Sequence, residues 1–164
     1  MTEPLSVTVD AAHQLGDAIR QSYEERALAL PGLVVIPRSG YLVGELISRQ
    51  WGVPGVDMLH ACVRKKEQKG RRKPSFEVGQ FPTRRLVKDR PLVVLDAVRH
   101  TGDTIGFVQK RLLDLGAASV ESAVLYDRSR DDEEVRNLPS FVVAHRTEFT
   151  IFEWEKDEHL PLPQ

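Results

Sequence analysis

Short apolar runs rich in β-branched residues alternate with stretches of helical periodicity along most of this chain. The runs with strand character lie at 33–36, 53–63, 91–96, 119–125 and 141–144. Runs that are apolar on both faces are typical of buried parallel strands. Helical connections of 10–15 residues between parallel strands form right-handed crossovers that cover the sheet. The alternation therefore predicts an α/β fold with a central, mostly parallel sheet flanked by helices.

The helical stretches carry apolar residues at three- and four-residue steps. The first covers residues 9–30, with Thr8 or Asp10 as its cap. Two more are expected around 42–47 and 105–115. No repeat or low-complexity linker interrupts the pattern, so we expect the 164 residues to form one domain.

Composition excludes several classes of protein. A single cysteine, Cys62, rules out an internal disulfide framework and a multi-cysteine zinc site. No apolar run approaches the roughly 18 residues that a membrane span needs. The amino terminus lacks the basic start and apolar run of a signal peptide. We therefore expect a cytoplasmic protein without a membrane partner.

Basic residues are concentrated between positions 64 and 73, where seven of ten residues are Lys or Arg. Because a block of like charges cannot enter a core, we expect a solvated loop. Three interpretations remain: a solubilising surface, a lid over a phosphorylated small molecule, or a nucleic-acid contact. The whole chain carries 23 Lys and Arg against 24 Asp and Glu, and the loop is poor in the aromatics that stack on single strands. Both facts favour a small phosphorylated ligand over nucleic acid.

Two loops at the predicted carboxyl edge of the sheet, 37–41 and 96–104, have unusual chemistry. Ligands bind at this edge in open α/β sheets. In the second loop, Asp96 leaves the strand and Thr101-Gly-Asp-Thr104 enters a helix, where backbone N–H groups and the helix dipole attract an anion. Gly102 permits the backbone angles that such a turn requires. A simply capped turn has the same composition, and the chain contains neither of the two common glycine-rich nucleotide-binding motifs.

The segment 92–104, LVVLDAVRHTGDT, resembles the loop of type I phosphoribosyltransferases that binds 5-phosphoribosyl 1-pyrophosphate (PRPP). The segment 35–41, VIPRSGY, is similar to the pyrophosphate loop of that family, and the basic stretch 64–85 lies where the family has a flexible lid loop. Residues 149–155, FTIFEWE, resemble the carboxyl-terminal segment of the xanthine, guanine and hypoxanthine branch.

The resemblance spans roughly residues 30–155 in the family's order. It implies the type I phosphoribosyltransferase fold in a single domain of residues 1–164, with a lid loop at about 64–85. It also implies a small carboxyl-terminal hood for base recognition at about 126–158.

The resemblance also implies a role for each matching residue. Asp96 would hold a ribose hydroxyl of PRPP and contact Mg²⁺ indirectly, through substrate or water. The 5′-phosphate would bind to the segment His100, Thr101, Gly102, Asp103 and Thr104. Pyrophosphate would contact Arg38, Ser39 and Gly40 beside a strained non-proline peptide bond, and the lid would supply Arg64, Lys65, Lys66 and Lys69. The base would meet Asp127, Arg128, Phe149, Thr150 and Ile151.

Three positions depart from the family's pattern. Ala97 replaces a second acid, which could weaken PRPP binding by about 1.5–3 kcal/mol. His100 replaces the aspartate that is the proposed acid/base in the hypoxanthine-guanine branch; it would either exchange a proton or act only as a polar donor beside the phosphate. At the next strand end, Asp127 and Arg128 stand where that branch presents a lysine to the base, and the sequence leaves open which of them faces it.

The resemblance implies an enzyme that joins a nucleobase, expected to be a purine, to the 5-phosphoribosyl group of PRPP and releases pyrophosphate, as in nucleotide salvage. Mg²⁺ would be the cofactor and the protein would form a homodimer. The alternative, motivated by Ala97, is a PRPP- or nucleotide-binding regulator of the same fold with little or no turnover.

Overall fold

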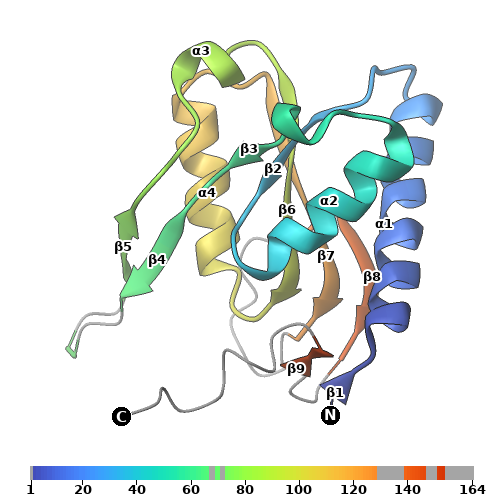
Figure 1. Ribbon diagram of the computed structural model, residues 1–164. Coiled ribbons are helices and arrows are strands. Elements are labelled where there is room, and N and C mark those ends of the chain that lie inside the picture. The colour runs from blue at the N-terminus through green and yellow to red at the C-terminus, as the bar shows by residue number, and fades with distance from the viewer. Residues whose placement is uncertain (1, 67–68, 71–72, 129–138, 147–150, 154–164) are drawn as a thin grey trace.

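The computed structural model describes residues 2–66, 69–70, 73–128, 139–146 and 151–153 (Figure 1). Its elements in chain order are β1 (Thr2–Glu3), α1 (Leu5–Glu25), β2 (Gly32–Val35), α2 (Ser39–Trp51), the short 3-10 helix η1 (Gly55–Asp57), β3 (Leu59–His60), β4 (Val63–Lys66), β5 (Ser75–Val78), α3 (Arg84–Val87), β6 (Pro91–Arg99), α4 (Asp103–Asp114), β7 (Ser119–Asp127), β8 (Phe141–His145) and β9 (Ile151–Phe152).

A five-stranded sheet with the strand order β3-β2-β6-β7-β8 forms the centre of the fold. Every neighbouring pair in it is parallel. Helices α1 and α2 lie on one side of this sheet and α4 on the other, as Figure 1 shows. The prediction of an α/β fold with a central parallel sheet flanked by helices is confirmed.

Alternate residues of each central strand enter two separate hydrophobic cores. In β6, Val93 and Leu95 pack with α1 and α2, whereas Leu92 and Val94 pack with α4. All four side chains are fully buried. A strand buried on both faces must be apolar at successive positions, which explains the uninterrupted apolar run that begins at Leu92.

The strand order reverses direction between β2 and β6. The chain goes from β2 outward to β3 on one side and then returns to β6 on the other side. In open parallel sheets, such a reversal leaves a crevice at the carboxyl ends of the two strands. The loops after β2 and β6 are the two that the sequence singles out, so the topology places them side by side.

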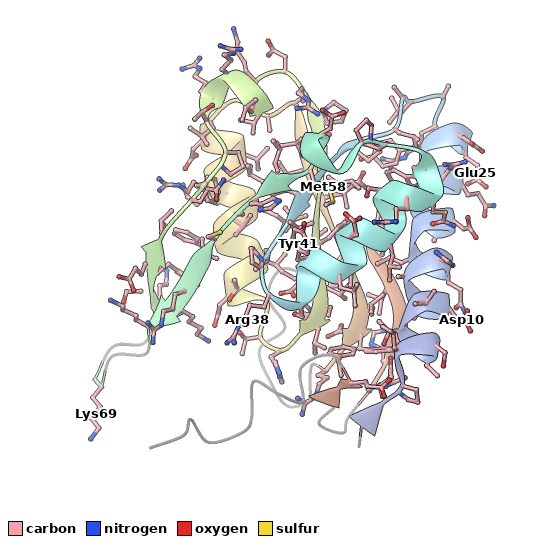
Figure 2. All side chains as sticks on the ribbon, viewed as in Figure 1. Asp10, Glu25, Arg38, Tyr41, Met58 and Lys69 are labelled. Carbon is pink, nitrogen blue, oxygen red and sulfur yellow. The ribbon has the colours of Figure 1, made fainter. Side chains whose placement is uncertain are left out.

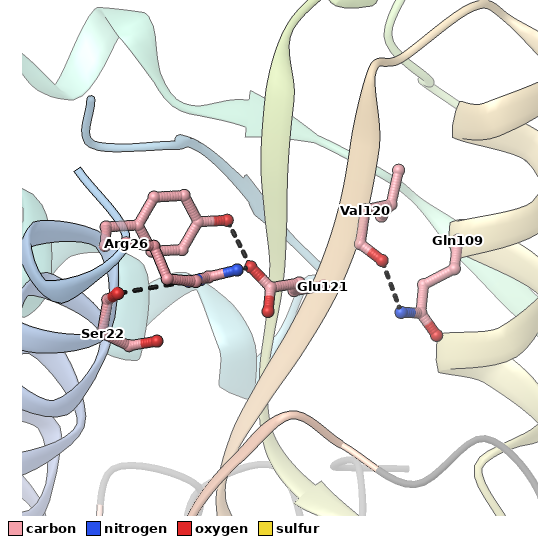
Figure 3. Close-up of polar contacts among 6 residues, drawn as sticks. Ser22, Arg26, Gln109, Val120 and Glu121 are labelled. Atoms are coloured by element: carbon pink, nitrogen blue, oxygen red, sulfur yellow. Dashed lines mark hydrogen bonds and ion pairs between the residues drawn. The ribbon is translucent and has the colours of Figure 1, made fainter. Parts of the chain in front are cut away.

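Polar contacts tie the two helical layers to β7 (Figure 3). The Glu121 carboxylate accepts hydrogen bonds from the Tyr23 hydroxyl at 2.5 Å and from Arg26 Nη2 at 3.0 Å, both on α1. On the opposite side, Gln109 Nε2 of α4 donates to the Val120 carbonyl at 3.1 Å. Burial raises the pKa of Tyr23, and the adjacent Glu121 carboxylate raises it further. These contacts fix α1 and α4 relative to the same strand.

The first helix differs from its prediction at both ends. It begins at Leu5 instead of residue 9, because Pro4 precedes it in an extended conformation and the Leu5 N–H donates to Glu153 Oε2 at 2.8 Å. It ends at Glu25 instead of residue 30, since Ala27 has a φ of 54° that no helix continues. The carboxylate that caps this helix therefore comes from the other end of the chain, which local periodicity cannot reveal.

The region 53–78 also differs from expectation. The single strand predicted over 53–63 is instead η1, β3 and the start of β4. The loop predicted over 64–73 is wrong for residues 64–66, because β4 pairs with β5 as an antiparallel hairpin. Because side chains alternate between the two faces of a strand, Arg64 and Lys66 are exposed, whereas Lys65 between them is half-buried.

Candidate functional site

The loop between β6 and α4 is a tight turn that ends in a helix N-terminus. Gly102, the cap of α4, is buried and has a φ of 82°, which a residue with a side chain rarely adopts. The Thr101 hydroxyl donates to Asp103 Oδ2 at 2.8 Å. Asp103 lies in the first turn of α4, where its charge complements the helix dipole. The N-terminus of α4 thus follows directly on a glycine turn with a threonine hydroxyl, which is the arrangement that anion sites use.

Hydrogen bonds from a serine of the other loop and from the backbone orient Asp96. Its Oδ1 atom accepts from the Ser39 hydroxyl at 3.0 Å and from the Ala97 N–H at 2.8 Å. Ser39 is the first residue of α2, directly after a cis peptide bond between Pro37 and Arg38. The Asp96 carboxylate, in the last half of β6, is therefore oriented by the loop that follows β2.

Gly40 allows the loop after β2 to lie directly against β6. A Cβ atom at Gly40 would come within 2.5 Å of the Leu95 carbonyl oxygen, so only glycine fits there. The Ile36 N–H also donates to this oxygen, at 3.0 Å. Arg38 is exposed and lies between the hairpin and the start of α2 in Figure 2.

A cavity of about 280 Å³ lies between the loop after β6 and the hairpin. It is lined by Lys65, Asp96, Val98, Arg99, His100, Thr101, Gly102, Thr104 and Ile105. A second cavity of about 280 Å³ has Pro37 and Arg64 in its wall. The structure thus brings Asp96, the Thr101–Thr104 turn and Lys65 together, and it brings Arg64 to the other loop.

The other two residues predicted for the lid lie outside these cavities. Lys66 pairs with Glu77 across the hairpin at 3.1 Å. Lys69, near the tip of the hairpin, projects away from the body of the protein in Figure 2. Neither lines the cavities that hold Lys65 and Arg64.

Asp127, predicted to contact a base, lies in a buried ion pair with Arg99. Arg99 Nη2 lies 2.9 Å from Asp127 Oδ2, and both side chains are 1% exposed. Sequence reasoning missed Arg99 because it ended the strand at Asp96, whereas β6 continues to Arg99 and pairs it with Asp127 in register. The available signal was that the apolar residues Ala97 and Val98 continue the strand pattern beyond Asp96 to an arginine.

Arg128 and His100 meet at the carboxyl ends of β7 and β6. Arg128 Nη1 lies 3.3 Å from His100 Nε2. Because a guanidinium only donates, Nε2 is the acceptor in this contact and the ring proton is assigned to Nδ1. Of the other predicted base contacts, Phe149 and Thr150 lie outside the described residues, and Ile151 belongs to β9, which pairs with β1.

A larger cavity, of about 520 Å³, lies around the first residues of β2 and β3. Among the described residues that line it are Gly32, Leu59, Phe81 and Arg90, and none of them is a predicted site residue. We therefore assign the candidate site to the opposite, carboxyl edge, where the loops after β2 and β6 converge.

The described part of the chain contains no helix with the length and apolar character of a membrane span. Within the same residues, no three His, Cys, Asp or Glu side chains gather as a metal site would require.

Comparison with known proteins identifies one matching family model and several solved structures with a similar fold. Residues 10–161 match the model of the phosphoribosyl transferase domain. The structure of a purine phosphoribosyltransferase from Pyrococcus horikoshii is similar, with 21% identity, a TM-score of 0.72, and coverage of 100% of this chain and 97% of that one. A xanthine-guanine-hypoxanthine phosphoribosyltransferase from Helicobacter pylori has 18% identity, a TM-score of 0.70 and 96% coverage of each chain. A hypothetical protein from Neisseria gonorrhoeae with bound ppGpp has 17% identity and a TM-score of 0.64, over 92% of this chain and 89% of that one. No curated protein matches the sequence.

Proposed function

Because the chain belongs to the phosphoribosyl transferase domain family, a family of enzymes, we propose that it transfers the 5-phosphoribosyl group of PRPP to a purine base in nucleotide salvage. One observation carries the proposal. At the switch point of the sheet, Asp96 lies in the wall of the same cavity as the Thr101–Thr104 turn and is held by Ser39 from the other loop. A phosphorylated sugar diphosphate needs a carboxylate for its ribose hydroxyls, an anion site for the sugar phosphate and a second loop for the diphosphate.

Each part of the site has a role in this proposal. The turn from His100 to Thr104 binds the 5′-phosphate through backbone N–H groups and the threonine hydroxyls. Asp96 accepts a hydrogen bond from a ribose hydroxyl. The loop of Arg38, Ser39 and Gly40 binds the pyrophosphate, and Arg64 lies close enough to this loop to contribute a second positive charge.

The reaction replaces one bond at C1 of the ribose with another. A ring nitrogen of the base attacks C1, the bond from C1 to the pyrophosphate oxygen breaks, and the nitrogen loses its proton. A charged loop that closes over C1 would exclude the water that otherwise competes with the base. The contact with Arg128 supports a donor role for the His100 Nδ1–H, one of the two roles that the sequence leaves open.

The described residues fit a Mg²⁺ ion that is bound mainly by the substrate. They contain no cluster of protein ligands that could hold a metal alone, and Asp96 is the acid in the cavity wall. Mg²⁺ commonly keeps several waters and binds through substrate phosphates with one or two carboxylates. When bound, the ion would neutralise charge on the pyrophosphate, while Asp96 would orient the ribose hydroxyls.

The purine assignment rests on the names of the two phosphoribosyltransferases that share the fold and on the resemblance of residues 149–155 to the purine branch. Because Asp127 lies in a buried ion pair with Arg99, we propose that it positions the end of β7 and that Arg128 faces an incoming base. We also propose a cytoplasmic homodimer, which cell fractionation and light scattering would test.

The decisive experiment measures PRPP-dependent release of pyrophosphate with Mg²⁺ and a panel of adenine, guanine, hypoxanthine, xanthine, uracil, orotate and cytosine. We expect turnover with a purine and a loss of kcat/KM in Asp96→Asn. The control is Asp114→Asn, which removes a charge from an exposed pair with Lys110 on α4. No turnover on any base, or equal activity in both variants, would refute the assignment.

The regulator alternative has one specific observation in its favour. Ala97 is fully buried in the core, so the position next to Asp96 offers no second acid to the ribose. A neighbour of the same fold holds the nucleotide ppGpp. Calorimetric binding of PRPP or a guanine nucleotide, together with no release of pyrophosphate in the panel, would favour this alternative over the transferase.

A further inference from the structure

Lys65 belongs to the cavity of the Thr101–Thr104 turn, although its sequence position suggested only a lid residue. Its Nζ atom lies 3.0 Å from Asp103 Oδ2, and its side chain lines the cavity beside the turn. The two charged side chains are 29% and 19% exposed. The lysine is therefore held at the anion site by a partly buried ion pair.

The strand register fixes the direction in which Lys65 points. Lys65 pairs with Phe76 of β5 in the hairpin. Phe76 stacks on Phe107 of α4, with ring centroids 4.4 Å apart and an angle of 17° between the rings. Because side chains alternate along a strand, Lys65 shares the face of the hairpin that packs on α4, and Lys66 lies on the other face.

Asp103 occupies the position of an anion in this arrangement. One of its oxygens, Oδ2, accepts hydrogen bonds from both Lys65 Nζ and the Thr101 hydroxyl. A phosphate group at the same turn would use the same two donors, and it would bring between one and two negative charges close to the carboxylate. Lys65 Nζ and the Thr101 hydroxyl would then donate to the phosphate instead of the carboxylate, because the phosphate carries more negative charge.

We propose that Lys65 is a phosphate-binding residue of this site, and that Asp103 holds it in place in the free protein by standing in for the phosphate. The inference rests on the proposed function, since it takes the Thr101–Thr104 turn to be the site of the 5′-phosphate. It assigns to Lys65 the phosphate that stays on the sugar, and not the pyrophosphate that leaves. Binding of the sugar phosphate thereby engages the hairpin directly.

The two members of the pair have opposite expected effects on phosphate affinity. Loss of Lys65 removes a charged donor, which costs about tenfold in the affinity for a phosphate ester. Loss of the charge on Asp103 removes both a competitor for Lys65 and a like charge beside the ligand, so the affinity should rise about threefold or more. A purely structural ion pair would make both variants bind more weakly.

The test is calorimetric titration of the full chain with ribose 5-phosphate, which carries no pyrophosphate. We expect Lys65→Met to raise Kd about tenfold and Asp103→Asn to lower it. Lys110→Met is the control, because it also removes a lysine from an ion pair, here an exposed pair with Asp114 that the site does not include. It should change Kd less than twofold.

The outcomes separate this inference from the proposed function. Equal Kd values for Lys65→Met and Lys110→Met, or weaker binding by Asp103→Asn, overturn the inference. Wild-type binding of ribose 5-phosphate then leaves the proposed function standing. A wild-type chain that binds neither ribose 5-phosphate nor PRPP overturns both. Tight binding by Asp103→Asn together with weak binding by Lys65→Met supports the assignment.

Discussion

The buried ion pair of Arg99 and Asp127 gives the sharpest stability prediction. Both side chains are 1% exposed, and Nη2 and Oδ2 lie 2.9 Å apart at the carboxyl ends of β6 and β7. Removing one partner of such a pair leaves a buried charge without its counterion and costs about 3–5 kcal/mol. We therefore expect Arg99→Met to lower the free energy of unfolding by about that amount, a large part of the roughly 5–15 kcal/mol that stabilises a typical domain.

Replacing both partners with apolar residues should cost much less than either single change. The double variant Arg99→Met with Asp127→Leu leaves no charge to be desolvated, and such replacements are often close to neutral. His145 Nδ1, on an exposed side chain, lies 3.6 Å from Asp127 Oδ2 and offsets only part of the loss in the Arg99 single variant. The double-mutant cycle should therefore give a coupling free energy of about 2 kcal/mol or more.

Urea unfolding followed by circular dichroism measures the free energy of unfolding of each variant, provided that its dependence on urea concentration stays the same. Lys110→Met is the control, because Lys110 forms an exposed pair with Asp114 at 2.8 Å and such pairs contribute about 0–1 kcal/mol. A cost below about 1 kcal/mol for Arg99→Met, or single effects that simply add, would refute the argument from burial.

Three further predictions concern other parts of the structure. Ser39→Ala removes the hydroxyl that orients the Asp96 carboxylate, so the KM for PRPP should rise several-fold in a steady-state assay while the melting temperature changes little. Gly40→Ala should destabilise the fold by about 1–3 kcal/mol in urea titrations, because the new methyl group would overlap the Leu95 carbonyl oxygen. Burial raises the pKa of Tyr126, with a further contribution from its hydrogen bond to a carboxylate. The folded state thus retains a proton that the unfolded state loses near pH 10, so stability should fall as pH rises above about 10, and less steeply in Tyr126→Phe.

The alternation of apolar runs and helical stretches was enough to predict the layers and the parallel sheet. Each signal is local: a strand buried on both faces must be apolar at successive positions, as Leu92 to Leu95 are, and a helix on one face must be apolar every third or fourth residue. The two ligand loops could also be predicted, because parallel strands all end at the same edge. Their residue types, Asp96 and the Thr101–Thr104 turn, then predicted a phosphate site at that edge.

The tertiary structure alone decided which residues meet across the chain. Glu153 caps the amino-terminal helix, and Arg99 pairs with Asp127. Lys65 pairs with Asp103 because of the register of a hairpin, which the run of basic residues did not predict. Each of these contacts joins residues between 28 and 148 positions apart. Periodicity describes which face of an element is buried, but it carries no information about the partner on the opposing element. That partner is set by strand order and register, which only the folded chain defines.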